Sequence, residues 1–401
     1  MRKTWIMLLC AFCLLIAPGS VRAQDFIESA VGESIEEEIA DNIGHALSSA
    51  DLYEIESYYN AYAKTLEPLT GGASLNNFIE KLATGGADFE ISSVFSLILG
   101  ALFNGLQQSM PAIVQIIVVA LLFSVITHFT PNFGSSGVSK TARTAQYVII
   151  GTMTIGILVC AFSVGADAIN AMTGFTADFF PLLITLLTAL GGITSSAILS
   201  PPAVFLTTGV SLFYQNFIMP LVIVLTVFTI INHFSASVKL NGFCGLLKSI
   251  IKWGIGISFT VFAGIFAIQG LLGSTFDGLS IKAAKFTISK FVPIVGTMFS
   301  ESADVLISSA LLIKNAVGIA GIIIIIGAVI SPVCALIGHY FLFKLAGAVL
   351  EPIAGGSMGR FSEDAAGVLL LLFAAVAAAA VMFFVTTAVI LGAGNSNIML
   401  R

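Results

Sequence analysis

The chain has very little charge beyond residue 90. Residues 91–401 contain 12 Lys or Arg and 8 Asp or Glu. A charge at the centre of a bilayer costs at least a few kcal/mol, so lipid selects long charge-free stretches. The mean hydropathy of +1.02 and the apolar content of 57% also exceed what a soluble globular protein shows. We therefore expect residues 91–401 to form an all-α, polytopic membrane domain in contact with the lipid bilayer.

Several kinds of chemistry are missing as well. The sequence has no GxxxxGK[ST] phosphate loop, no GxGxxG after a strand, no HExxH and no GxSxG. Its histidines are far apart, and its cysteines outside the first 23 residues are three isolated ones. No long basic run indicates nucleic-acid binding. These absences argue against an enzyme, and we expect no catalytic residue, no cofactor, no metal site and no nucleic-acid partner.

The first 90 residues differ in composition from the rest. Residues 1–23 combine Arg2 and Lys3 with a short apolar stretch and small residues before Gln24, which is typical of a cleaved signal peptide. Residues 24–90 hold 14 Asp or Glu against two Lys. We expect this acidic segment to be helical and extracytoplasmic, with one helix over 52–66 and a short one after Ser74.

Four tyrosines lie in the acidic segment, and two interpretations of them stay open. They pack two helices together, or they form a docking face for a partner. They are Tyr53, Tyr58, Tyr59 and Tyr62.

Charge-free runs predict six or eight membrane-spanning helices. Each run exceeds the roughly 20 residues that one helix needs to cross. The run 179–238 is too long for one span, and its prolines at 201, 202 and 220 predict breaks. The predicted spans lie near 111–129, 145–165, 180–199, 203–219, 220–232, 253–273, 316–338 and 366–392, with 203–232 alternatively one kinked span.

The few charges suggest an orientation. With residues 24–90 outside, the positive-inside rule gathers seven basic residues on the inner face and places Asp167 and Asp178 outside. The basic residues are Lys140, Arg143, Lys239, Lys248, Lys252, Lys344 and Arg360. Residues 279–292 fit the rule poorly, and their one-sided pattern predicts a helix lying in the membrane interface or a loop helix packed on the bundle.

Polar residues in or beside the spans are the candidate functional residues, because their burial in lipid is costly. They line an aqueous path or a subunit contact, or they form hydrogen bonds between helices of one protomer. These residues are Gln215, Asn216, Gln269, Glu301, Asp304, Lys314 and Asn315.

Four stretches carry a family resemblance. They read QGLLGSTFDGLSIKAAKF at 269–286, FVPIVGTMFS at 291–300, LLIKNAVGI at 311–319 and VMFFVTTAVILGAGN at 381–395. With the layout of leader, exported segment and polytopic body, they resemble the stage III sporulation protein AE family over nearly the whole chain. The C-terminal half carries most of this resemblance.

The resemblance implies a protein of endospore-forming bacteria in the mother-cell-derived membrane around the forespore. Its partners would be the other subunits of a channel-like complex, including an ATPase and ring-forming proteins, and further copies of itself. The complex would support late forespore gene expression, and the resemblance carries over no catalytic residue. A self-contained secondary transporter is the alternative, and a scaffold without a pore is the third hypothesis.

Overall fold

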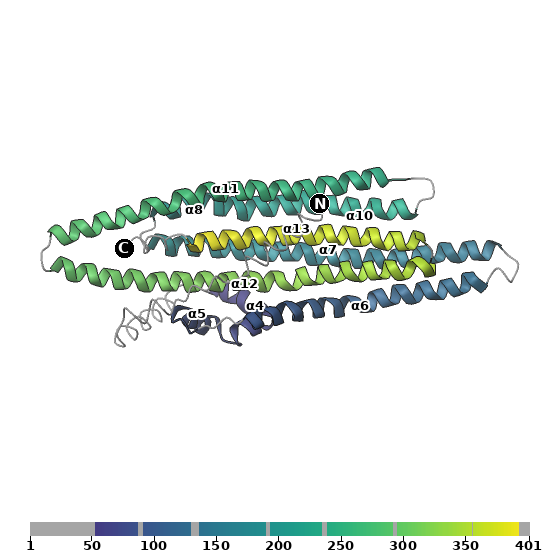
Figure 1. Cartoon of the computed structure of the whole chain (residues 1–401), viewed down its shortest axis with the longest axis horizontal. Coiled ribbons are helices and arrows are strands. Elements are labelled where there is room, and N and C mark those ends of the chain that lie inside the picture. The colour runs from purple at the N-terminus through teal and green to yellow at the C-terminus, as the bar shows by residue number, and fades with distance from the viewer. Residues whose placement is uncertain are drawn as a thin grey trace.

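The structure, a computed structural model, is built from helices (Figure 1). It describes residues 53–86, 91–129, 136–189, 193–234, 239–291, 295–354 and 356–392. No strand occurs within these ranges, so the expected all-α class is confirmed.

Two short helices precede the long ones. They are α4 (Tyr53–Thr70) and α5 (Leu75–Ala83), which match the helices expected after residues 51 and 74. Gly71 and Gly72 between them have φ values of 61° and 72°, a left-handed conformation that glycine adopts without steric cost.

The remaining described helices follow in a series of antiparallel passes. They are α6 (Ile91–Phe129), α7 (Ser136–Ala189), α8 (Ile193–Val204), the π-helix η2 (Phe205–Val210), α9 (Ser211–Phe213), the π-helix η3 (Tyr214–Ile218), α10 (Met219–Phe234), α11 (Asn241–Phe291), α12 (Val295–Ala354) and α13 (Gly356–Gly392). Among the described residues, six helical segments are long and apolar enough to cross a membrane. This number agrees with the smaller of the two expected numbers of spans.

The run 179–238 folds differently from the prediction. The expected span 180–199 is wrong, because α7 continues to Ala189 and a new helix begins at Ile193. Residues 195–234 then form one candidate span rather than two. Asp167 and Asp178 therefore lie within α7 and not beyond its end.

Prolines do not end the helices of this segment. A proline at position i removes a hydrogen bond to the carbonyl of residue i−4 and its ring presses on that carbonyl. For Pro220 that carbonyl belongs to Asn216, and η3 contains it. The wider π-turn gives the proline ring room, so the helix continues into α10. Pro201 and Pro202 lie inside α8, which packs on both α7 and α11.

The helix ends gather in two groups. In Figure 1 the junctions of α6 with α7, α10 with α11 and α12 with α13 all lie at the right-hand end. We call this the inner end, because the sequence places the basic residues beside these same junctions. The far ends of α11 and α12 project furthest at the opposite, outer end. The expected separate helix at 279–292, whether in the membrane interface or in a loop, is wrong, because α11 runs unbroken through Phe291.

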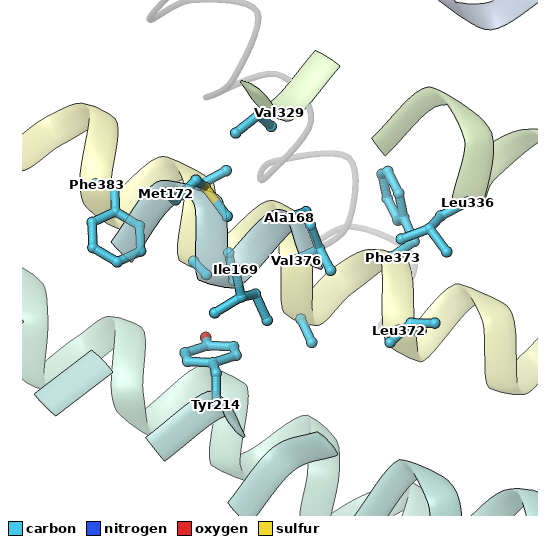
Figure 2. Packing of buried hydrophobic residues seen from close by; sticks show 14 of the residues in the cluster. Ala168, Ile169, Met172, Tyr214, Val329, Leu336, Leu372, Phe373, Val376 and Phe383 are labelled. Carbon is cyan, nitrogen blue, oxygen red and sulfur yellow. The ribbon is translucent and has the colours of Figure 1, made fainter. Parts of the chain in front are cut away.

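Two helices form the centre of the bundle. In the most apolar stretch of each candidate span, 61% of residues are buried for α12 and 67% for α13, against 22% for α6 and 17% for α11. Figure 2 shows α7 side chains such as Ile169 and Met172 packed near Val376 and Phe383 of α13. The outer helices expose large apolar side chains, for example Val118, Val159 and Trp253, as expected for a surface that meets lipid.

Glycines allow a close contact between α6 and α12. A Cβ atom on Gly105 of α6 would lie 2.9 Å from Cα of Ala335 in α12. Gly338, one turn further along α12, in turn faces the backbone of Gly105. Small residues at such a crossing let two backbones touch, which is how helices associate where lipid supplies no hydrophobic driving force.

Candidate functional site

The candidate residues lie on three elements. Gln215 and Asn216 belong to η3, Gln269 to α11, and Glu301, Asp304, Lys314 and Asn315 to α12. The side chains of Gln269, Glu301 and Asp304 lie outside the described residues. The structure therefore places four of the seven candidate side chains.

Gln215 joins η3 to α7. Its Nε2 donates to Oδ1 of Asn170 at 2.6 Å and to Oγ of Ser211 at 2.9 Å. Asn216 points away and is exposed on the surface of the single chain. The two neighbouring candidates thus have different surroundings, one between helices and the other on the outside.

Tyr214 fixes this region to the core. Its ring is fully buried, and Figure 2 shows its side chain directed toward Ile169 of α7. Its hydroxyl lies 3.1 Å from Oγ of Ser258 in α11. A buried tyrosine needs such a partner, because an unpaired buried hydroxyl costs about 1–3 kcal/mol. This tyrosine and Ser258 were not among the sequence candidates.

Lys314 caps the C-terminal end of α13. Its side chain is fully buried, and its ammonium donates to the carbonyl oxygen of Leu391 at 2.8 Å. The last carbonyls of a helix lack intrahelical partners and carry partial negative charge, so a cation stabilises them. The neighbouring Asn315 has a buried Oδ1 without a hydrogen-bond partner among the described residues.

A charged cluster at the inner end was missed by the sequence reasoning. Asp364 of α13 contacts Nε2 of His233 in α10 at 2.9 Å and Nζ of Lys248 in α11 at 3.0 Å. The preceding Glu363 pairs with Lys344 of α12. Two adjacent carboxylates on α13 therefore join it to three other helices. The signal in the sequence was the pair Glu363-Asp364 itself, isolated at the start of a long apolar run.

His339 of α12 lies at the contact with α6. Its Nδ1 is 2.6 Å from the carbonyl oxygen of Ala335, and its Nε2 is 3.1 Å from Oγ of Ser109 in α6. The ring is therefore part of the α6–α12 contact around Gly105.

The tyrosines of α4 dock this helix onto the bundle. Tyr59 is buried, stacks on Phe78 of α5 and donates to the carbonyl of Ala73 at 2.6 Å. Tyr58 packs edge-on against Phe175 of α7, and its hydroxyl donates to Asp178 at 3.0 Å.

Burial and the Asp178 carboxylate raise the pKa of Tyr58 to about 12. Both of these factors disfavour the phenolate and favour the neutral, donating hydroxyl. Two of the four tyrosines thus pack helices, while Tyr53 is exposed.

Metal binding finds no support in the side chains the structure places. Among the described residues, no three His, Cys, Asp or Glu come together in a group that could hold an ion. The polar contacts instead connect one helix to another. Fold and contacts together define a polytopic helical membrane protein whose polar residues join its helices.

Comparison with known proteins agrees with this class and narrows it. Residues 73–394 match the family described as Stage III sporulation protein AE. Stage III sporulation protein AE of Bacillus subtilis (strain 168) is 28% identical over 364 residues, which cover 88% of each chain. The chain belongs to the stage III sporulation protein AE family. No solved structure matches it.

Proposed function

We propose that the chain is a non-enzymatic membrane subunit of the channel-like complex that links mother cell and forespore during sporulation. In this role it supports late forespore gene expression. Family membership, which implies a role in sporulation, is the observation that carries the proposal. Within the complex, the subunit would either line the conduit or support it as a scaffold, depending on its contacts with the other subunits.

The length of the helices supports a role beyond the bilayer. A helix rises 1.5 Å per residue, so the 60 residues of α12 extend about 90 Å, whereas the hydrocarbon core is about 30 Å thick. Part of the bundle therefore presents helical surface outside the lipid. α4 and α5 add further surface by packing on α12, with Leu66 of α4 against Gly327. Such a surface suits attachment of other subunits, including the ring-forming proteins and the ATPase that the proposal names.

The proposed location follows from the same scheme. The chain would be a multi-pass protein of the mother-cell-derived membrane around the forespore. Residues 1–23 would be its signal peptide, residues 24–90 an extracytoplasmic helical segment and residues 91–401 the membrane domain. The first 52 residues lie outside the described part of the chain, so this division stays a prediction.

A complementation experiment tests the proposal. In a sporulating strain without the chain, a late forespore reporter should stay silent, and the wild-type gene should restore it. Gly105→Leu should fail to restore it, because Leu at this position forces α6 away from α12. Gly100→Leu on the same helix meets open space and should restore it. Normal reporter activity without the chain contradicts the proposal.

Partner subunits give a second measurement. The tagged wild-type chain, purified from sporulating cells in mild detergent, should retain the ATPase and the ring-forming proteins. A chain that supports the reporter but purifies without either protein would contradict its place in the complex.

Secondary transport is the alternative function. The π-helices η2 and η3 interrupt the regular hydrogen-bond pattern within one candidate span, and such turns are frequent at functional sites. The purified chain in liposomes would then move a defined solute by itself, with loss of transport in Gln215→Leu. A permeability equal to that of empty liposomes would rule this alternative out for the solutes assayed.

A further inference from the structure

One surface of the bundle is polar although it belongs to candidate membrane spans. We call it the α7 polar face, and it consists of Ser163, Asp167 and Asn170 of α7 with Gln215 and Asn216 of η3. All except the half-buried Gln215 are exposed in the single chain. A carboxylate and carboxamides that face lipid are costly, so this face requires water or a protein partner.

A second polar surface lies on α6. We call it the α6 carboxamide face, and it consists of Asn104, Gln107 and Gln108, all of them exposed. The other side of the same helix turns carries Gly105 and Ser109, which pack on α12. The carboxamides thus point away from their own bundle.

The contacts between helices set the depth of the α6 face. Gly105 lies against Ala335 of α12. Further along α12, the carbonyl of Phe343 accepts a hydrogen bond from Ser362 of α13. α12 and α13 are antiparallel. Ala335 comes eight positions before Phe343, so it lies level with the residue eight positions after Ser362, which is Leu370.

The α7 face lies at the same depth. A Cβ on Gly165 of α7 would be 3.1 Å from Leu372 of α13 and 3.3 Å from Met219 of α10. Leu372 is within one helical turn of Leu370, and Leu370 lies level with Ala335 and therefore with Gly105. Asp167 and the η3 carboxamides lie within about two turns of this layer. Both polar faces therefore occupy one layer of the bundle.

The two faces belong to opposite edges of the molecule. α6 packs on α4, α7 and α12, whereas the 193–234 segment packs on α7, α11 and α13. Figure 1 shows α6 along the lower edge and the α10–α11 pair along the upper edge. A second copy placed beside the first at equal depth can therefore bring one face against the other.

We propose that copies of this chain associate head to tail, with the α6 carboxamide face of one copy against the α7 polar face of the next. The chemistry of the faces is complementary. The NH₂ groups of Asn and Gln donate, and the Asp167 carboxylate, which already accepts from Ser163 at 3.2 Å, has further lone pairs. Unlike faces make a heterologous contact, which closes into a ring if the rotation permits. The proposal does not rest on the sporulation role.

Cysteine cross-linking in membranes tests the contact with the full chain. Ser163→Cys and Gln108→Cys are placed in separately tagged copies whose native cysteines are replaced. Mild oxidation should give a disulfide-linked dimer when the two variants are co-expressed, and none from either variant alone. Val125→Cys, exposed on α6 but several turns closer to the inner end, is the matched control and should not link to Ser163→Cys.

Each other outcome overturns the proposal. A Ser163→Cys dimer with itself would show a two-fold contact. The absence of any dimer would show that the copies do not touch here, and a product containing a different protein would assign the face to another subunit. In a second test, Asp167→Leu should reduce the cross-link between Asn104→Cys and Ser163→Cys by about three- to tenfold, the range of one interhelical hydrogen bond in a membrane. An unchanged yield would also contradict the proposal.

Discussion

Asp364 contacts a histidine and a lysine that come from two different helices. Its contacts with His233 and Lys248 connect α13 to α10 and α11 at the inner end. The neighbouring Glu363 pairs with Lys344 of α12. Its side chain is 57% exposed, against 39% for that of Asp364. Solvent screening weakens exposed pairs, so the two adjacent carboxylates should differ in their contribution to stability.

Asp364→Asn should lower the free energy of unfolding by on the order of 1–2 kcal/mol. This value is below that for a fully buried pair, because solvent reaches part of the Asp364 side chain. The measurement is the thermal unfolding midpoint in detergent. Glu363→Gln is the matched control, with an expected loss below about 1 kcal/mol. A larger effect from Glu363→Gln would reverse this ranking.

Tyr58→Phe separates a hydrogen bond from ring packing. The phenylalanine keeps the edge contact with Phe175 but leaves Asp178 without the hydroxyl, which should cost about 0.5–1.5 kcal/mol at neutral pH. The folded pKa of about 12 exceeds the ordinary value of 10.0, so this stabilisation is complete below pH 10 and is lost as pH rises toward 12. Proteolysis of α4 against pH should show this loss in the wild type and not in Tyr58→Phe.

At the scale of elements, one glycine determines how closely two helices approach. Backbone atoms of Ala335 and Cys334 surround the position that a Cβ on Gly105 would take, at 2.9 to 3.0 Å. Backbone cannot rotate away as a side chain can, so the helices themselves would have to separate. The Ser109–His339 contact in the same crossing would separate with them.

Gly105→Ala should therefore destabilise the protein by about 1–3 kcal/mol, the usual cost of overpacking. Gly100→Ala on the same helix has open space and should be neutral or slightly stabilising, since alanine favours helix over glycine. Thermal unfolding midpoints of the two variants in the same detergent give the comparison. Equal midpoints would mean that α6 can shift without cost.

At the scale of the whole molecule, the continuous segment 193–234 determines the number of crossings. With six spans, residue 200 lies two turns from the start of α8 at Ile193, near the outer end. With eight spans, the same residue would lie in a turn on the inner face. The two topologies thus assign residue 200 to opposite sides of the membrane.

Ser200→Cys in a cysteine-free chain should react with an impermeant maleimide only from the extracytoplasmic side. Gly242→Cys, exposed near the start of α11, should react only after the cytoplasmic side is opened. Labelling in intact and permeabilised cells provides both measurements. Cytoplasmic labelling of Ser200→Cys would restore the eight-span topology.

Local patterns predicted the elements that depend on local forces. Apolar length predicted most spans, and Ser74 correctly marked the start of α5. The predicted end of the span near 145–165 was wrong. Asp167 and Asp178 suggested a loop, whereas α7 continues through both residues and carries them on its exposed surface.

Contacts between distant residues could not be predicted. His233 and Asp364 are 131 residues apart, and only the fold brings them together. Gln215 was singled out as a polar residue in a span, but its partner Asn170 depends on the rotation of α7 about its axis, which apolar composition does not specify. The functional roles of Gln215, Asn216, Lys314 and Asn315 stay predictions.

The length of α12 makes it a lever. Only about 30 Å of its length can lie within the hydrocarbon core of the bilayer, so about 60 Å of helix lies outside it. If most of that length extends from one side, a tilt of about 10° within the membrane displaces the distant tip by roughly 10 Å. A small change in lipid packing or subunit contact inside the bilayer thereby becomes a large movement far from it.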